Sequence, residues 1–264
     1  MTNKQDIEQA AATLYQAEKT GVPCAPVSSL FDKGDLETAY SVQEINTVKS
    51  LESGRRLVGR KIGLTSPVVQ AQLGVDQPDY GMLFADMALG DCEEIDIQRV
   101  MQPKVEAEVA LVLGGDLDQD HHTIADIIAA TDFALPCIEI VGSRIQNWEI
   151  NIVDTIADNA SSGCFVLGSS PRHLSELDLR LCGMVLDLNG EPASTGAGQA
   201  CLGNPLNAAR WLADAMKAAC RPLQAGDTIL TGALGPMVSV AAGDNVSVRI
   251  NGLGTVSVQF TGGV

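Results

Sequence analysis

Histidines and basic residues are scarce in this 264-residue chain, and both shortages exclude classes of function. The three histidines, His121, His122 and His173, are too few to favour a His-rich zinc site or Ser-His-Asp catalysis. Lys and Arg number 17 against 33 Asp and Glu, a formal net charge of -16. Binding to a nucleic-acid backbone or to anionic lipid requires clustered positive charge. We therefore expect neither nucleic acid nor a membrane surface as a partner.

The sequence also shows no pattern typical of a membrane span, a signal peptide or a disulfide framework. No apolar run approaches the roughly 18–20 residues that cross a bilayer. The N-terminus is polar and amphipathic, without the apolar core of a signal peptide. The seven cysteines are odd in number, widely spaced and without a CxxC motif, which is typical of reduced, mostly buried thiols. The expected location is the cytoplasm.

The acidic excess is concentrated in the middle of the chain. Residues 61–180 hold 20 acidic and 6 basic groups, a net of -14 out of the total of -16. With 45% hydrophobic and 19% charged residues, the chain is not an acidic disordered segment. Its length suits one large domain or two small ones.

Helical periodicity dominates the first 55 residues, where Asp35 is a candidate N-cap for the second of two helices. A capping box that begins at Thr123 predicts a short helix. Asn204-Pro205 is a typical start for a further helix, because proline is favoured in the first helical turn.

The remaining segments favour strands. Residues 104–113 alternate between apolar and other side chains and end at Gly114-Gly115, which predicts a hairpin-type turn. The C-terminal segment consists of two alternating runs around Asn251-Gly252, which predicts a hairpin. Further strands are expected at 135–141, 163–168, 181–188 and 227–232. Because strands and helices do not alternate regularly, the fold class is α+β: a mixed or antiparallel β roll with an N-terminal helical section.

Two glutamates on the strand 104–113 are candidate cation ligands. Side chains alternate along a strand, so Glu106 and Glu108 share a face and lie roughly 6.5–7 Å apart along it. This spacing lets two carboxylates converge on one ion. The alternative is a solvated sheet face, which is the commoner meaning of two glutamates at this spacing.

Glu139 is unusual because it lies between Ile138 and Ile140 in a stretch suited to full burial. A buried, unpaired carboxylate is very unfavourable, and a divalent cation is one remedy. Three carboxylates describe a hard-ion site, which favours Mg²⁺ or Mn²⁺ over Zn²⁺. Alternatively, Glu139 pairs with Arg144 or Lys104.

Other polar residues are weaker candidates when taken alone. Lys61 lies in a mostly apolar stretch and can present its ammonium group to an anion, or it is a surface lysine with a buried stem. Asp79 falls in QPDYG, which looks like a turn. The small polar residues of 158–163 either line a site or cap backbone groups.

Several long segments, in order, resemble the 2-keto-4-pentenoate hydratase family, in the hydratase/decarboxylase group of the fumarylacetoacetase-like superfamily. They are GRKIGLTSP at 59–67, GVDQPDYGMLFADM at 74–87, QPKVEAEVALVL at 102–113, LPCIEIVGSRIQNW at 135–148, VDTIADNASSG at 153–163, CLGNPLNAARWLA at 201–213 and LTGALGPM at 230–237. The resemblance covers nearly the whole chain. It implies a β roll of the fumarylacetoacetase C-terminal-domain type over residues 61–264, preceded by the helical section 1–60.

The resemblance also implies a site and a reaction. It places Glu106, Glu108 and Glu139 as ligands of Mg²⁺ or Mn²⁺. By motif it places Lys61, Asp79 and Ser161 in the active site. The implied reaction is hydration of 2-hydroxypenta-2,4-dienoate to 4-hydroxy-2-oxopentanoate in the meta-cleavage degradation of aromatic compounds.

The resemblance leaves rival functions open. One is 4-oxalocrotonate decarboxylase, which shares the metal carboxylates, and another is a non-catalytic partner subunit of a hydratase–decarboxylase complex. Hydrolysis is disfavoured, because the three histidines lie outside the matching segments. The family also implies a homo-oligomer, often pentamer-based, and a possible association with a decarboxylase or aldolase of the same pathway.

Overall fold

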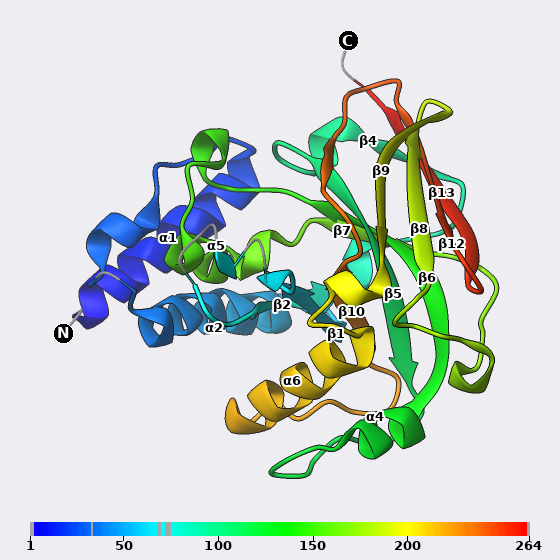
Figure 1. Cartoon of the computed structure of the whole chain (residues 1–264). Helices are drawn as coiled ribbons and strands as arrows, with labels where there is room; N and C mark the ends of the chain where they lie inside the picture. Colours follow the sequence, from blue (N-terminus) through cyan, green and yellow to red (C-terminus); the bar gives the residue numbers. More distant parts are fainter. Residues whose placement is uncertain (1–2, 33, 68–69, 72–74, 263–264) are drawn as a thin grey trace.

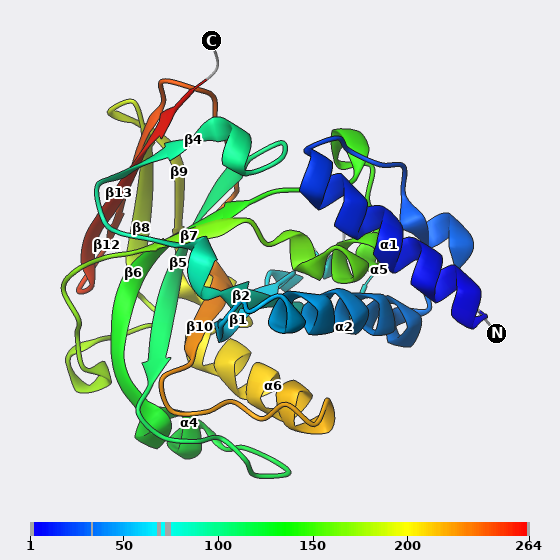
Figure 2. The ribbon, with the colours of Figure 1, turned by 180° about the vertical axis from the view of Figure 1, so that it is seen from behind.

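The computed structural model describes residues 3–32, 34–67, 70–71 and 75–262. The strands form two sheets on one side of the molecule, and helices α1, α2 and α5 gather on the other (Figure 1). The view from behind shows the same separation, with α6 and α4 at one end of the sheets (Figure 2).

The larger sheet is mixed and has eight strands among the described residues. Its order is β2 (Asp79–Phe84), β1 (Leu57–Gly63), β10 (Thr228–Ala233), β5 (Lys104–Leu113), β6 (Thr131–Val141), β7 (Cys164–Leu167) and β3 (Ala88–Leu89), with β11 (Val238–Ser239) paired to β5. The pairs β1–β10 and β3–β7 are parallel, and the other pairs are antiparallel.

The smaller sheet has five strands in the order β4 (Glu93–Asp96), β13 (Gly254–Thr261), β12 (Asn245–Ile250), β8 (Gly183–Leu188) and β9 (Glu191–Ala197). Apolar side chains from both sheets form one continuous core, in which Ile138, Phe165 and Phe260 are fully buried. Burial of such side chains is the main source of stability in a domain of this size.

The helices begin where the sequence offers caps. They are α1 (Lys4–Thr20), α2 (Leu36–Glu52), α4 (Ile124–Ala130), α5 (Ile152–Ala157) and α6 (Pro205–Ala218), with short 3₁₀ turns at Val27–Leu30, Ala85–Met87, Ile97–Arg99, Gln146–Trp148, Asn159–Ser161, Leu174–Glu176 and Gly198–Ala200. Asp35 caps α2, Thr123 forms a capping box at α4, and Asn204 caps α6. A second apolar cluster joins α1 and α2 to α5.

The predicted α+β fold, with N-terminal helices and a curled mixed sheet, is confirmed, as are the C-terminal hairpin β12–β13 and the predicted helix starts. No helix among the described residues is long and apolar enough to cross a membrane.

Two local predictions were wrong. Gly114-Gly115 is not a hairpin turn: β5 and β6 do pair, but α4 lies between them, and both glycine N–H groups donate to the carbonyl of Ala130 at its end. The loop assigned to Asp79 is a strand, because Asp79 is the first residue of β2 and is fully buried.

Close contact between strands β1 and β10 yields a stability prediction. A Cβ built on Gly59 would overlap the backbone of Thr228, lying 2.8 Å from its carbonyl carbon. We expect Gly59→Ala to lower the free energy of unfolding by about 3 kcal/mol, since backbone cannot give way as a side chain does. Urea denaturation measures the change.

The matched control is Gly183→Ala in β8, where an added Cβ has no atom within 4 Å among the described residues. Its stability should stay within about 0.5 kcal/mol of wild type. Equal losses in the two variants would show that the β1–β10 contact is not the cause.

Candidate active site

Three carboxylates meet at the centre of the larger sheet because of the register between β5 and β6. Glu106 lies directly opposite Glu139 across this antiparallel pair, and Glu108 is two residues further along the same face. Each of the three offers a carboxylate oxygen, and these oxygens all lie within 4.8 Å of one another. Such a cluster matches the oxygen-rich surroundings that hard divalent cations take.

Burial makes this cluster electrostatically unfavourable by itself. Glu108 and Glu139 are completely buried, and Glu106 is partly buried. Burial raises the pKa of Glu106 to about 7, and the negative charge of Glu139 adds to the effect. Burial together with Glu139 and Glu106 raises the pKa of Glu108 well above its usual value. The trio therefore needs positive charge to stay ionised near neutral pH.

Oxygens of the cluster are free to accept a cation. Glu108 uses one oxygen to accept a hydrogen bond of 2.8 Å from the backbone N–H of Gly232. Its other oxygen, Oε1, and Glu139 Oε2 are buried and make no hydrogen bond to any described residue. Buried polar atoms without partners are rare, and a bound cation would satisfy both. The donor set consequently fits Mg²⁺ or Mn²⁺.

Lys61, on β1, is the basic residue nearest to the trio among the described residues. Its ammonium lies 3.2 Å from Glu139 Oε1 and donates a 2.8 Å hydrogen bond to the carbonyl of Ala160. Burial lowers the pKa of Lys61, but the surrounding carboxylates, Glu139 first, raise it by more, so the side chain stays charged. The alternative of an exposed lysine is wrong, since Lys61 is 3% exposed.

Asp79 enters the same face from β2, where Gly63 leaves room for its carboxylate and Gly81 leaves room for the 158–162 turn. Asp79 pairs with Gly63 across β1–β2, and a Cβ on Gly63 would overlap its carboxylate. Gly81 pairs with Lys61, and a Cβ there would overlap the carbonyl of Asn159. Burial raises the pKa of Asp79 to about 6, against the opposing charge of Lys61. This pKa lets Asp79 exist in both protonation states near neutral pH.

Ser161 reaches the site on a turn that comprises residues 158–162. Asn159, Ala160 and Ser161 all have positive φ, at 52°, 51° and 56°. This conformation costs non-glycine residues about 1–2 kcal/mol each. The Ser161 hydroxyl is buried and has no hydrogen-bond partner among the described residues. It is thus available to a bound molecule.

The structure brings four of the six predicted residues, Glu106, Glu108, Glu139 and Asp79, around a fifth, Lys61. The sixth, Ser161, follows Ala160, whose carbonyl accepts a hydrogen bond from Lys61.

The backbone groups of Gly232 and Ala160 carry no signal in the sequence. Arg144 was expected only as an alternative partner of Glu139, but it pairs with Asp158 and holds the turn, as does Asn159. The one sequence signal for the turn was the unusual run of small polar residues at 158–163.

The site and fold belong to a known class. The fumarylacetoacetate (FAA) hydrolase C-terminal family matches residues 57–261. Because this match spans well over half of the chain, the protein belongs to that family.

Particular relatives are similar over nearly the full chain. The TodF product hydratase of Pseudomonas putida strain F1 is 61% identical over 96% of this chain and 95% of its own. The 2-keto-4-pentenoate hydratase 1 of Dechloromonas aromatica is 61% identical over 96% of each chain. Among solved structures, 4-oxalocrotonate decarboxylase from Pseudomonas putida G7, complexed with magnesium and adipate, has a TM-score of 0.93. It shares 35% identity and covers 98% of this chain and 99% of its own.

The charge of the glutamate cluster predicts how the protein responds to Mg²⁺. Glu106→Gln keeps the shape of the side chain and removes one negative charge. In EDTA, the variant should unfold at a temperature equal to or above that of wild type, because repulsion is relieved. At 100 times the dissociation constant, Mg²⁺ should stabilise wild type by about 2.7 kcal/mol and the variant hardly at all. Thermal unfolding followed by circular dichroism measures both.

Glu94→Gln is the control, since Glu94 is an exposed residue of β4. It should respond to Mg²⁺ as wild type does. A full Mg²⁺ response in Glu106→Gln would remove Glu106 from the cation site.

Proposed function

We propose that this protein hydrates 2-hydroxypenta-2,4-dienoate (2-keto-4-pentenoate) to 4-hydroxy-2-oxopentanoate, with Mg²⁺ or Mn²⁺, in the meta-cleavage degradation of aromatic compounds. The expected hydratase activity is confirmed by curated relatives that are 61% identical over nearly the whole chain. The observation that carries the proposed mechanism is the buried trio of carboxylates beside a charged lysine.

Glu106, Glu108 and Glu139 would hold the cation. When bound, it would supply a Lewis acid and a template that orients an anionic substrate. The related decarboxylase structure contains magnesium, which supports this assignment. The three glutamates and Lys61 together carry two negative charges. One divalent cation would neutralise them and make the acidic centre suitable for an anionic substrate.

Lys61 stabilises the negative charge that develops on the 2-oxygen. The dienol must gain a proton at C5 and lose the proton of its 2-hydroxyl to become the conjugated 2-oxo-3-enoate. One water then adds across C3 and C4, with its oxygen bonding to C4, one proton going to C3 and the other staying on the new hydroxyl. Electron density passes to the 2-oxygen when water adds. A fixed, buried ammonium acts strongly on such charge because little water screens it. The hydrogen bond to Ala160 holds this ammonium in place.

Asp79 is the proposed proton-transferring group, with Lys61 as the second candidate. Its burial, its position on β2 beside Lys61 and its pKa near 6 suit a carboxyl group that both accepts and donates a proton. The Ser161 hydroxyl would hold the substrate carboxylate or orient the attacking water.

The native quaternary structure remains a prediction. We expect a pentamer-based homo-oligomer, with possible association with a decarboxylase or aldolase of the same pathway. The division into a helical section 1–60 and a catalytic domain 61–264 is likewise kept as a proposal.

A substrate panel with the purified, metal-loaded protein tests the reaction. We expect the protein, with no other subunit present, to hydrate 2-hydroxypenta-2,4-dienoate, which is measured as a decrease in the ultraviolet absorbance of this substrate. EDTA should lower the rate by at least about 10²-fold, and added Mg²⁺ or Mn²⁺ should restore it. Release of CO₂ from 4-oxalocrotonate, without hydration of the dienoate, would assign the decarboxylase function instead. An inactive chain that gains activity only with a decarboxylase would assign the role of a partner subunit.

Substitution of Asp79 tests the proton transfer. Asp79→Asn should lower kcat by about 10²–10⁴-fold, because the amide cannot exchange a proton, and should leave Mg²⁺ binding by calorimetry unchanged. Asp120→Asn, at an exposed position, is the control and should retain full kcat. Full activity of Asp79→Asn would leave Lys61 as the proton-transferring group.

A further inference from the structure

The 158–162 turn is held at every one of its carbonyl groups. The carbonyls of Asp158 and Ser162 accept hydrogen bonds from Arg144 Nη2 and Nη1. The carbonyl of Asn159 accepts from the Ser162 side chain at 2.8 Å, and that of Ser161 from the backbone N–H of Gly142 at 2.9 Å. The carbonyl that remains, of Ala160, accepts from Lys61. A strained backbone of this kind persists only where its surroundings fix it.

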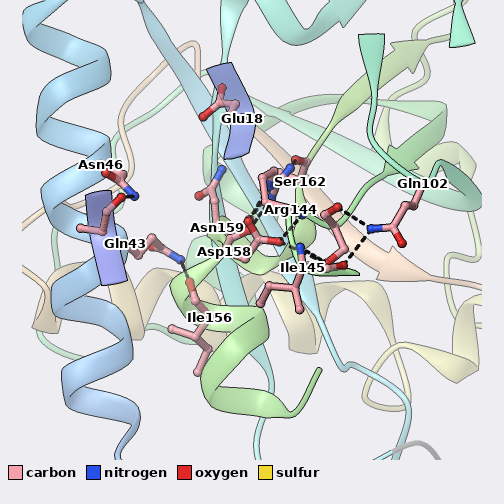
Figure 3. A network of polar contacts seen from close by, with 12 residues as sticks. Glu18, Gln43, Asn46, Gln102, Arg144, Ile145, Ile156, Asp158, Asn159 and Ser162 are labelled. Atoms are coloured by element: carbon pink, nitrogen blue, oxygen red, sulfur yellow. Dashed lines mark hydrogen bonds and ion pairs between the residues drawn. The ribbon is translucent and has the colours of Figure 1, made fainter. Parts of the chain in front are cut away.

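Arg144 binds both ends of the turn at once. Its guanidinium group contacts the carbonyls of Asp158 and Ser162, while its Nε and its backbone N–H donate to the buried Asp158 carboxylate. Figure 3 shows Arg144 between Asp158 and Ser162 at the centre of this network. A planar guanidinium makes several such contacts in fixed directions, which a lysine ammonium cannot do.

Asn159 fixes the middle of the turn to the strand that carries Asp79. Its side-chain oxygen accepts from the backbone N–H of Met82 at 2.7 Å, and its side-chain nitrogen donates to the carbonyl of Met82 at 3.0 Å. The amide thereby pairs with the open edge of β2 as a neighbouring strand would.

A cavity borders the turn outside the candidate active site. It has a volume of about 160 Å³ and is lined by Arg144, Asp158, Asn159 and Ser162, but by none of the six candidate site residues. Arg55 and Asn46 also line it. A small cation added to the solution therefore has space beside the position of Arg144.

From these contacts we infer that Arg144 and Asn159 are positioning residues for the hydration reaction. They hold the 158–162 turn so that the carbonyl of Ala160 fixes the Lys61 ammonium and Ser161 stays next to it. Neither residue contacts the glutamate trio in the network described here, so both act on Lys61 and Ser161 and not on cation binding. The inference rests on the proposed function.

Steady-state kinetics of Arg144→Ala and Arg144→Lys test this role. We expect kcat to fall about 10²-fold in both, because small misplacements of reacting groups have effects of this size, with KM changed less than threefold. Mn²⁺ binding, measured by electron paramagnetic resonance, should match wild type. Guanidinium chloride at tens of millimolar should restore at least a tenth of wild-type kcat to Arg144→Ala, while sodium chloride should not.

Arg55→Ala is the matched control, because Arg55 lines the same cavity but pairs with Asp86 and Glu18 and not with the turn. It should keep wild-type kcat and show no response to guanidinium. Wild-type kcat in Arg144→Ala, or equal losses in Arg144→Ala and Arg55→Ala, would overturn the inference. Inactivity of the wild-type protein on the dienoate would instead count against the proposed function.

Asn159→Asp provides a second test that does not depend on the folding of the Arg144 variants. It keeps the acceptor for Met82 N–H but turns the donor to the Met82 carbonyl into a repelling oxygen. We expect a kcat loss of at least tenfold with a melting temperature near wild type. Asn46→Asp is the control, because Asn46 also lines the cavity but donates its side-chain hydrogen bond to the carbonyl of Ala11 in α1. This variant should retain full kcat. Full kcat in Asn159→Asp would remove Asn159 from the positioning role.

Discussion

The pairing of β5 with β6 places Glu106 directly across from Glu139 in the interior of a sheet. Like charges at opposed positions destabilise a sheet, and the absence of water here strengthens the repulsion. Yet the same register buries Ile138 and Val109, so a one-residue shift of the pairing, which would separate the glutamates, would also turn apolar side chains to the wrong face. The core thus enforces an arrangement that its own electrostatics oppose, and positive charge at this point is the structural requirement.

Lys61 meets that requirement only in part, because one ammonium faces three glutamates and Asp79. A divalent cation would complete it, and it would satisfy the buried carboxylate oxygens that make no hydrogen bond to a described residue. Most of the acidic excess between residues 61 and 180 has no such meaning. Glu93, Glu94 and Asp96, for example, are exposed on β4. The acidic residues that indicate a functional site are those on buried strands, namely Glu106, Glu108, Glu139 and Asp79.

The sequence was sufficient to predict what depends on neighbouring residues. Alternation along 104–113 correctly placed Glu106 and Glu108 on one face, and capping residues marked the helix starts. The sequence alone could not predict that Glu106 lies opposite Glu139, because this depends on a pairing between strands that are separated by a loop and α4. Asp79 was misread because Gly81 gives its strand the composition of a turn. That glycine is there to make room for the 158–162 turn.

Arg144 shows a further limit of sequence reading. A single arginine after an apolar strand carries no pattern that distinguishes it from a surface residue, and its role depends on the carbonyls of Asp158 and Ser162 at the two ends of the turn. Every role proposed for the site residues depends on a cation bound at the three glutamates. Crystals soaked in Mn²⁺ and measured at a wavelength with strong manganese anomalous scattering test it most directly. We predict one strong anomalous peak bounded by the carboxylates of Glu106, Glu108 and Glu139. A folded protein whose Mn²⁺ peak lies elsewhere, or that shows none at these glutamates, would contradict it.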